Sequence, residues 1–114
     1  MLYSVVIPCY KSSQTIRKVV EMTAAEFEQM NIKDYEFVLV DDHSPDDGAT
    51  YRELKALADD YPYVKAICLA KNAGQHNALM CALNHASGDY LIAMDDDMQT
   101  HPSQLPILLK EIHF

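Results

Sequence analysis

Four short apolar runs recur along the chain, and each is followed by a stretch whose apolar residues have the spacing of an amphipathic helix. The runs cover residues 3–8, 36–40, 64–69 and 90–94, and the helical stretches begin near residues 12, 50, 75 and 102. Alternation of strands and helices favours a parallel sheet, because right-handed helical crossovers join neighbouring parallel strands. The pattern predicts an α/β fold with a parallel sheet of about four strands flanked by helices.

Local signals predict where these elements begin and end. Pro8 is expected to close the first strand, since proline has no N–H to donate to a neighbouring strand. Ser12 or Ser13 is expected to cap the first helix. Thr50 and Glu53 have the form of a capping box, which predicts that the second helix opens there.

The segment that follows each apolar run is polar. In chain order these segments are Pro8-Cys9-Tyr10, Asp41-Asp42-His43, Lys71-Asn72 and Asp95-Asp96-Asp97. In open parallel sheets, ligands bind just outside the carboxyl ends of the strands. Because all four segments are expected at that edge, the sequence predicts one binding site there.

Three consecutive carboxylates end the last apolar run. The run from Tyr90 to Met94 carries no charge, which predicts an interior strand buried on both faces. Neighbouring carboxylates repel one another unless water, a proton or a cation intervenes, and a hard divalent cation shared with phosphates is the economical partner. Side chains alternate along an extended segment, so Asp95, Asp97 and Gln99 are expected on one side. Asp96 is expected to point away and to tolerate substitution.

The residue types at this edge suit a nucleotide. Tyr10 or Pro8 can form a wall against the base, and Asp42 can accept a hydrogen bond from a base N–H. Lys71 can neutralise phosphate, and a cation on Asp97 can bridge two phosphates. The chain has neither the glycine-rich dinucleotide fingerprint nor a P-loop, so metal and side chains are expected to hold the phosphates instead.

Composition excludes several other classes. Nine basic and seventeen acidic side chains give a formal net charge of −8, which argues against a protein that binds nucleic acid through its phosphates. No apolar run approaches the ~20 residues that span a bilayer, and the start does not resemble a signal peptide. Cys9, Cys68 and Cys81 lie in apolar contexts without metal-type spacing, so we expect reduced core cysteines in a cytoplasmic protein.

Five stretches resemble the family 2 glycosyltransferases of GT-A fold. They are residues 4–10, 40–46, 71–74, 88–90 and 94–97, and their order and spacing match along essentially the whole chain. The continuation from Asp97 to Pro102 is similar to the branch that makes polyprenyl- and dolichol-phosphate sugars. The resemblance implies a Rossmann-like GT-A nucleotide-binding half.

This resemblance implies a metal-dependent enzyme of the hexosyltransferase type. It would transfer a sugar, with inversion, from a UDP- or GDP-sugar donor to a saccharide hydroxyl or a polyprenyl phosphate. The chain would be the nucleotide-sugar-binding part, residues 1–114, without the acceptor-binding half and the catalytic base, and would be inactive alone. Any membrane association, at the cytoplasmic face, would come from regions outside these residues.

Carried over by position, the resemblance implies that Pro8 and Tyr10 border the nucleotide and that Asp42 contacts the base. Lys71, which stands where the family often has arginine, would lie near the diphosphate or ribose. His43 stands where the family commonly has glycine, and we expect a turn residue with an exposed ring there.

The same resemblance assigns the catalytic carboxylates. Asp95 is expected near the ribose and sugar, and Asp97 with Gln99 is expected to ligate Mg²⁺ or Mn²⁺. Two other functions remain open at this point. One is a non-catalytic nucleotide-binding module, and the less favoured one is a Mg²⁺-dependent phosphoryl-transfer or receiver-type domain.

Overall fold

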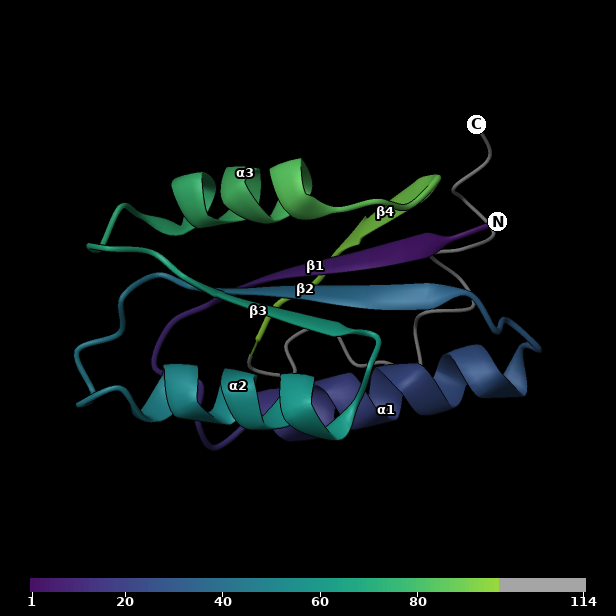
Figure 1. Ribbon diagram of the computed structural model, residues 1–114, viewed down its shortest axis with the longest axis horizontal. Helices are drawn as coiled ribbons and strands as arrows, with labels where there is room; N and C mark the ends of the chain where they lie inside the picture. Colours follow the sequence, from purple (N-terminus) through teal and green to yellow (C-terminus); the bar gives the residue numbers. More distant parts are fainter. Residues whose placement is uncertain (97–114) are drawn as a thin grey trace.

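The structure is a computed structural model of the 114-residue chain, and residues 1–96 are described here. The strands are β1 (Tyr3–Cys9), β2 (Tyr35–Asp41), β3 (Val64–Cys68) and β4 (Tyr90–Ala93), and the helices are α1 (Ile16–Gln29), α2 (Ala49–Asp60) and α3 (Gln75–His85). All strand pairs are parallel, and the order in the sheet is β3-β2-β1-β4 (Figure 1). The α/β prediction is confirmed. None of these three helices is long and apolar enough to cross a membrane.

Helices cover both faces of the sheet. Helices α1 and α2 lie on one face, and α3 lies on the other (Figure 1). The strands alternate accordingly: Val5 and Phe37 pack towards α1 and α2, whereas Val6 and Val38 pack towards α3. Both faces of β1 and β2 are therefore buried, as expected for the central strands of a parallel sheet. On the α3 side, the helix contributes small side chains, Ala78 and Ala82, which allow it to lie close to the strands.

Strand β1 continues through Pro8 and ends at Cys9, so the prediction that Pro8 closes the strand is wrong. The pairing of β1 with β4 ends at Val6, which lies opposite Ala93. Pro8 pairs only with Val40 of β2 and lies beyond the last pair on the other side. Pro8 has no N–H to donate, but no residue of β4 is paired with it and would need that donor.

The two predicted helix starts differ from the structure, by one residue for α2 and by more for α1. Helix α1 begins at Ile16, and the amide of Ser12 instead donates to the Thr50 hydroxyl at 3.1 Å. Helix α2 begins at Ala49, after Gly48 in a left-handed conformation. The carboxylate of Asp46 caps it by accepting the Thr50 amide at 3.1 Å. The Glu53 carboxylate pairs instead with a guanidinium nitrogen of α1, Arg17 Nε, at 2.8 Å.

Strand β4 lies at the edge of the sheet among the described residues, so the prediction of an interior strand buried on both faces is wrong. Ile92 is buried on the side of α1, but Leu91 is 44 % exposed on the opposite side. The cause is the position of α3, which packs across β1 and β2. An uncharged run is compatible with burial on both faces, but only a covering element can produce it.

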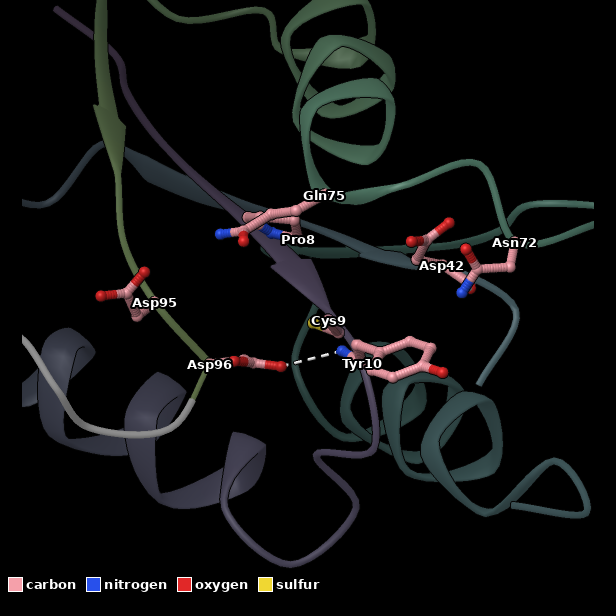
Figure 2. Close-up of a pocket in the computed structure, with 8 residues that line it drawn as sticks. All are labelled: Pro8, Cys9, Tyr10, Asp42, Asn72, Gln75, Asp95 and Asp96. Carbon is pink, nitrogen blue, oxygen red and sulfur yellow. Dashed lines mark hydrogen bonds between the residues drawn. The ribbon is translucent and has the colours of Figure 1, made fainter. Parts of the chain in front are cut away.

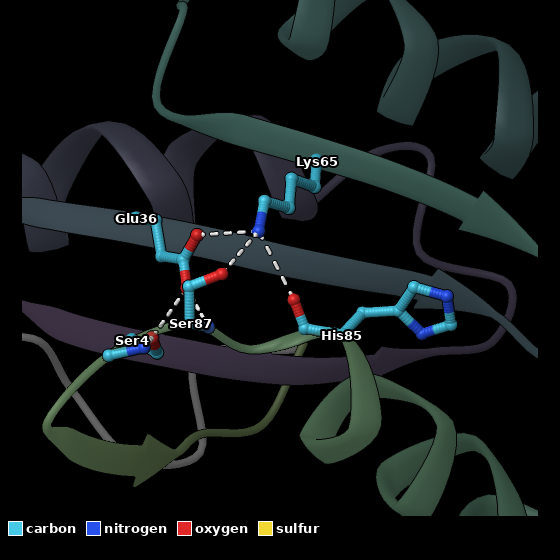
Figure 3. A network of polar contacts seen from close by, with 6 residues as sticks. Ser4, Glu36, Lys65, His85 and Ser87 are labelled. Atoms are coloured by element: carbon cyan, nitrogen blue, oxygen red, sulfur yellow. Dashed lines mark hydrogen bonds and ion pairs between the residues drawn. The ribbon is translucent and has the colours of Figure 1, made fainter.

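A buried carboxylate ties the C-terminal end of α3 to the sheet, at the end of the strands opposite to their polar loops (Figure 3). Glu36 accepts hydrogen bonds from the Ser4 hydroxyl and the Ser87 amide, both at 2.6 Å, and pairs with Lys65 at 2.9 Å. Burial by itself raises the pKa of Glu36, but these three partners outweigh it, so the pKa lies below that of an ordinary glutamate.

This lowered pKa makes the stability of the fold depend on pH. The ionised carboxylate stabilises the folded chain above the unfolded-state pKa, which is about 4.3 for glutamate, and this contribution is lost as the pH falls through the lower folded-state pKa. We expect Glu36→Gln to be less stable than the wild type at pH 7, with a difference that narrows below about pH 4.3. Urea denaturation across this pH range measures it, with Asp59→Asn on the exposed end of α2 as the charge control. A difference that is constant with pH would contradict the account.

Candidate nucleotide-binding site

A cavity of about 470 Å³ opens at the carboxyl ends of the strands (Figure 2). Pro8 and Tyr10 approach it from the end of β1, Asp42 from the end of β2, and Asp95 from the segment after β4. These are four of the residues predicted from the sequence, and the fold brings them to one cavity. Three segments far apart in the sequence meet here because the strands are parallel and end at the same edge.

The remaining predicted residues are placed differently. Lys71 is exposed and is not among the residues that line the cavity. Asp97 and Gln99 lie outside the described residues, so their predicted roles stay predictions. His43 has a left-handed backbone (φ 51°), and its exposed ring lies with Nδ1 3.2 Å from the Leu69 carbonyl oxygen. The expected turn residue is confirmed, and its positive φ matches the glycine that the resembling family has there.

Four further residues line the cavity that were not predicted as ligand contacts, although three of them belong to the segments predicted at this edge: Cys9, Asn72, Gln75 and Asp96. Two of them carried a signal. Asn72 follows Lys71 in a loop at a strand end, and Gln75 is the first residue of a crossover helix, whose N-terminus lies at the same edge. For Cys9, the only indication in the sequence was its position between Pro8 and Tyr10.

Asp42 holds the loop that leads into α3. Its side chain is buried, with 4 % exposed, and its two carboxylate oxygens accept the amides of Ala73 and Gly74 at 2.8 and 3.1 Å. The side-chain amide of Asn72 donates to the backbone oxygen of Asp42 at 3.2 Å. A carboxylate has about four acceptor positions. Asp42 therefore keeps acceptor capacity towards the cavity while it fixes the loop on the other side.

Asp96 lies on the cavity, so the expectation that it points away from the site is wrong (Figure 2). Its carboxylate accepts the backbone amide of Tyr10 at 2.8 Å. The strand ends at Ala93, and strict alternation of side chains applies only within a strand. Beyond that point the direction of each carboxylate depends on the loop rather than on its sequence number.

The surroundings of the Cys9 thiol disfavour its ionised form. Burial raises the pKa of the thiol well above its ordinary value, and the negative charges of Asp96 and Asp41 raise it further. A protonated thiol is a poor nucleophile. All three cysteines are unpaired. Cys9 is a core residue as predicted, but the prediction is wrong for Cys68, which is exposed, and for Cys81, which is half-buried.

The described part of the site has carboxylates but no complete set of ligands for a divalent cation. Asp95 and Asp96 place two carboxylates on the cavity, and oxygen ligands of this kind suit Mg²⁺ or Mn²⁺. Within residues 1–96, no three His, Cys, Asp or Glu side chains form a group that could hold a metal ion. The donor chemistry fits such a cation, and its predicted ligands, Asp97 and Gln99, follow directly in the sequence.

Comparisons with known proteins identify the family of the chain. Residues 4–114 match the model of the family described as glycosyl transferase family 2. The chain is 40% identical over 106 residues to the undecaprenyl-phosphate 4-deoxy-4-formamido-L-arabinose transferase of Proteus mirabilis (strain HI4320), with 93% of this chain and 32% of that protein covered. It is 37% identical over 106 residues, with the same coverage, to the protein of that name from Enterobacter sp. (strain 638). These names agree with the polyprenyl-phosphate branch predicted from the sequence.

Solved structures share the fold. The mannosyltransferase PcManGT from Pyrobaculum calidifontis, in complex with GDP-Man and Mn²⁺, superposes with a TM-score of 0.75 at 22% identity, covering 98% of this chain and 32% of that chain. TarS 1–349 of S. aureus, in complex with UDP-GlcNAc, has a TM-score of 0.60 at 23% identity, covering 96% and 32%. The chain thus spans about a third of the length of the curated relatives it matches. The match of the family model over residues 4–114 shows that the chain belongs to glycosyl transferase family 2.

Proposed function

We propose that the chain forms the nucleotide-sugar-binding part of a metal-dependent, inverting glycosyltransferase. The observation that carries the proposal is the cavity at the strand ends, where Pro8, Tyr10, Asp42 and Asp95 come together. Its volume of about 470 Å³ falls in the usual range of small-molecule sites. Proteins of similar fold have been crystallised with GDP-Man and with UDP-GlcNAc, which supports a UDP- or GDP-sugar as the donor.

Each residue would act on one part of the donor. Pro8 and the Tyr10 ring border the base, and the free acceptor positions of Asp42 receive a base N–H. Asp95, which lines the cavity, would accept hydrogen bonds from the ribose or the sugar. Asp97 and Gln99 would hold Mg²⁺ or Mn²⁺, which supplies positive charge to the diphosphate.

The acceptor we propose is a polyprenyl phosphate, with a saccharide hydroxyl as the alternative. The names of the curated relatives support the first, since they refer to undecaprenyl phosphate. A phosphate acceptor is already ionised at neutral pH and needs little help from a general base. We place this chemistry on the cytoplasmic side of the membrane, as the predicted reduced cysteines favour.

Calorimetric titration of UDP and GDP, each with and without Mn²⁺, tests the proposal. The wild type is expected to bind at least one of the two diphosphates, at least about tenfold more tightly with the metal, a difference of about 1.4 kcal/mol. Asp97→Ala is expected to bind equally with and without Mn²⁺, because it lacks the predicted metal ligand. Asp59→Ala, a charge change on the exposed end of α2, is the matched control and should behave as the wild type.

The outcomes separate the candidate functions. Failure of both diphosphates to bind would contradict the nucleotide site itself. Binding that is indifferent to metal in the wild type would favour the non-catalytic nucleotide-binding module. An acid-labile adduct formed with acetyl phosphate and Mg²⁺, detected by mass spectrometry, would favour the receiver-type domain, and we expect none.

A further inference from the structure

Three successive backbone amides between β1 and α1, those of Tyr10, Lys11 and Ser12, are each held by a side chain from another part of the chain. Their acceptors are, in the same order, the side chains of Asp96, Ser44 and Thr50, at 2.8, 2.9 and 3.1 Å. The loop at the end of β1 is therefore fixed from outside, because it has no regular secondary structure of its own.

Asp96 differs from the other two acceptors in two respects. It is the charged one, and a hydrogen bond to an ionised acceptor is stronger than one to a hydroxyl. Its own backbone is also tethered, because its carbonyl oxygen accepts the hydroxyl of Thr15, the residue before α1, at 2.7 Å. Asp96 thus holds the loop at both of its ends and connects it to the run of carboxylates.

Of the three residues whose amides are held, Tyr10 is the one that lines the cavity. Its ring lines the cavity but is 44 % exposed, and the Lys11 ammonium lies 5.4 Å from the ring centre. The backbone of Tyr10 sets the position and direction of the Cα–Cβ bond from which the ring extends, and it restricts the rotamers that the ring can adopt. The Asp96 hydrogen bond acts on that backbone directly (Figure 2).

We propose that Asp96 is a positioning residue: by accepting the Tyr10 amide, its carboxylate fixes the backbone that directs the Tyr10 ring along the cavity wall. The segment of three carboxylates that follows β4 is thereby linked by a hydrogen bond to the side of the cavity that Tyr10 forms. The effect on nucleotide binding rests on the proposed function, whereas the effect on Tyr10 does not.

The first experiment needs no ligand. Amide exchange of Tyr10 in the 114-residue chain is measured by NMR for the wild type, Asp96→Ala and Asp96→Asn. Asp96→Ala removes the acceptor, and the Tyr10 amide is expected to exchange about tenfold faster or more, the loss of about one strong hydrogen bond. Asp96→Asn keeps an acceptor oxygen of the same reach, and protection is expected to return. Protection of the Val38 amide in the central strand β2 reports whether each variant is folded.

The second experiment measures the affinity for UDP and GDP without metal. Asp96→Ala is expected to weaken binding about fivefold to tenfold, and Asp96→Asn to restore most of it. In a Tyr10→Ala background, which keeps the backbone amide but has no ring, Asp96→Ala is expected to change the affinity little. This absence of an additional effect is the signature of a residue that acts through Tyr10.

An unchanged exchange rate of the Tyr10 amide in folded Asp96→Ala would overturn the proposal. Equal losses of protection in Asp96→Ala and Asp96→Asn would also overturn it, because they would indicate that the charge of Asp96 matters rather than its hydrogen bond. An equal effect of Asp96→Ala with and without the Tyr10 ring would also overturn it. If the wild type binds neither nucleotide, the proposed function fails, and the exchange experiment still decides the role of Asp96 at Tyr10.

Discussion

Replacing Gly88 with alanine is expected to lower the free energy of unfolding by about 3 kcal/mol. A Cβ on Gly88 would lie 2.3 Å from the Ser4 hydroxyl oxygen and 2.9 Å from both the Leu2 carbonyl oxygen and the Ser4 nitrogen. Two of these atoms belong to the backbone at the start of the central strand β1. The third is committed, since the Ser4 hydroxyl donates to Glu36 and accepts the Gly88 amide at 2.8 Å. No neighbour can yield without breaking the polar contacts beneath α3.

Urea denaturation followed by circular dichroism measures this loss, with two variants as controls. Ser87→Ala changes the adjacent exposed residue and removes one contact with Lys65, so we expect a change below about 1 kcal/mol. Gly74→Ala introduces a side chain where no atom lies within 4 Å but φ is 94°, which isolates the cost of backbone strain from the cost of a clash. A Gly88→Ala protein as stable as Ser87→Ala would show that the strand start is more deformable than these distances imply.

Replacing Asp42 with alanine is expected to produce the largest loss of nucleotide affinity, about 30-fold, which corresponds to about 2 kcal/mol. The reason is that the residue has two tasks. It is predicted to accept a hydrogen bond from the base, and it holds the amides of Ala73 and Gly74 in front of α3. Without the carboxylate of Asp42, a residue that is itself 4 % exposed, both amides lose a charged acceptor.

Calorimetry without metal and amide exchange at Ala73 and Gly74 together separate the two tasks. Asp42→Asn is the matched variant, because it keeps the size but replaces one acceptor oxygen with an NH₂ group that cannot accept. We expect faster exchange at one or both amides in Asp42→Asn and at both in Asp42→Ala, with weakened binding in each. Weakened nucleotide binding with unchanged exchange of the Ala73 and Gly74 amides would assign the whole effect to the contact with the base. Unchanged nucleotide binding would show that Asp42 is not part of the site.

Much of the fold was predictable from short-range patterns. Apolar runs such as Val38-Leu39-Val40 and the helical spacing between them predicted the parallel sheet, since burial on both faces of a strand requires an unbroken apolar run. The location of the site followed from the same pattern, because parallel strands bring their carboxyl ends to one edge. Pro8, Tyr10, Asp42 and Asp95 could be placed at the cavity for this reason.

What could not be predicted depends on contacts between distant segments. Ser12 and Glu53 have the chemistry of helix caps, but the Ser12 amide contacts Thr50 and the Glu53 carboxylate contacts Arg17, 38 and 36 residues away. The exposure of Leu91 depends on where α3 crosses the sheet, and no local signal encodes that crossing.

By itself, the sequence determined the order of strands and helices, the edge at which polar residues gather, and the family to which the chain belongs. The first two depend on periodicity and on residue type, which are local, and the family follows from the resemblance of five stretches. Only the tertiary structure decided the direction of individual side chains beyond the strand ends. Asp96 was expected to point away from the site, and it instead holds the Tyr10 amide at 2.8 Å. Alternation stops where strand β4 stops, and from there the neighbouring loops direct each carboxylate.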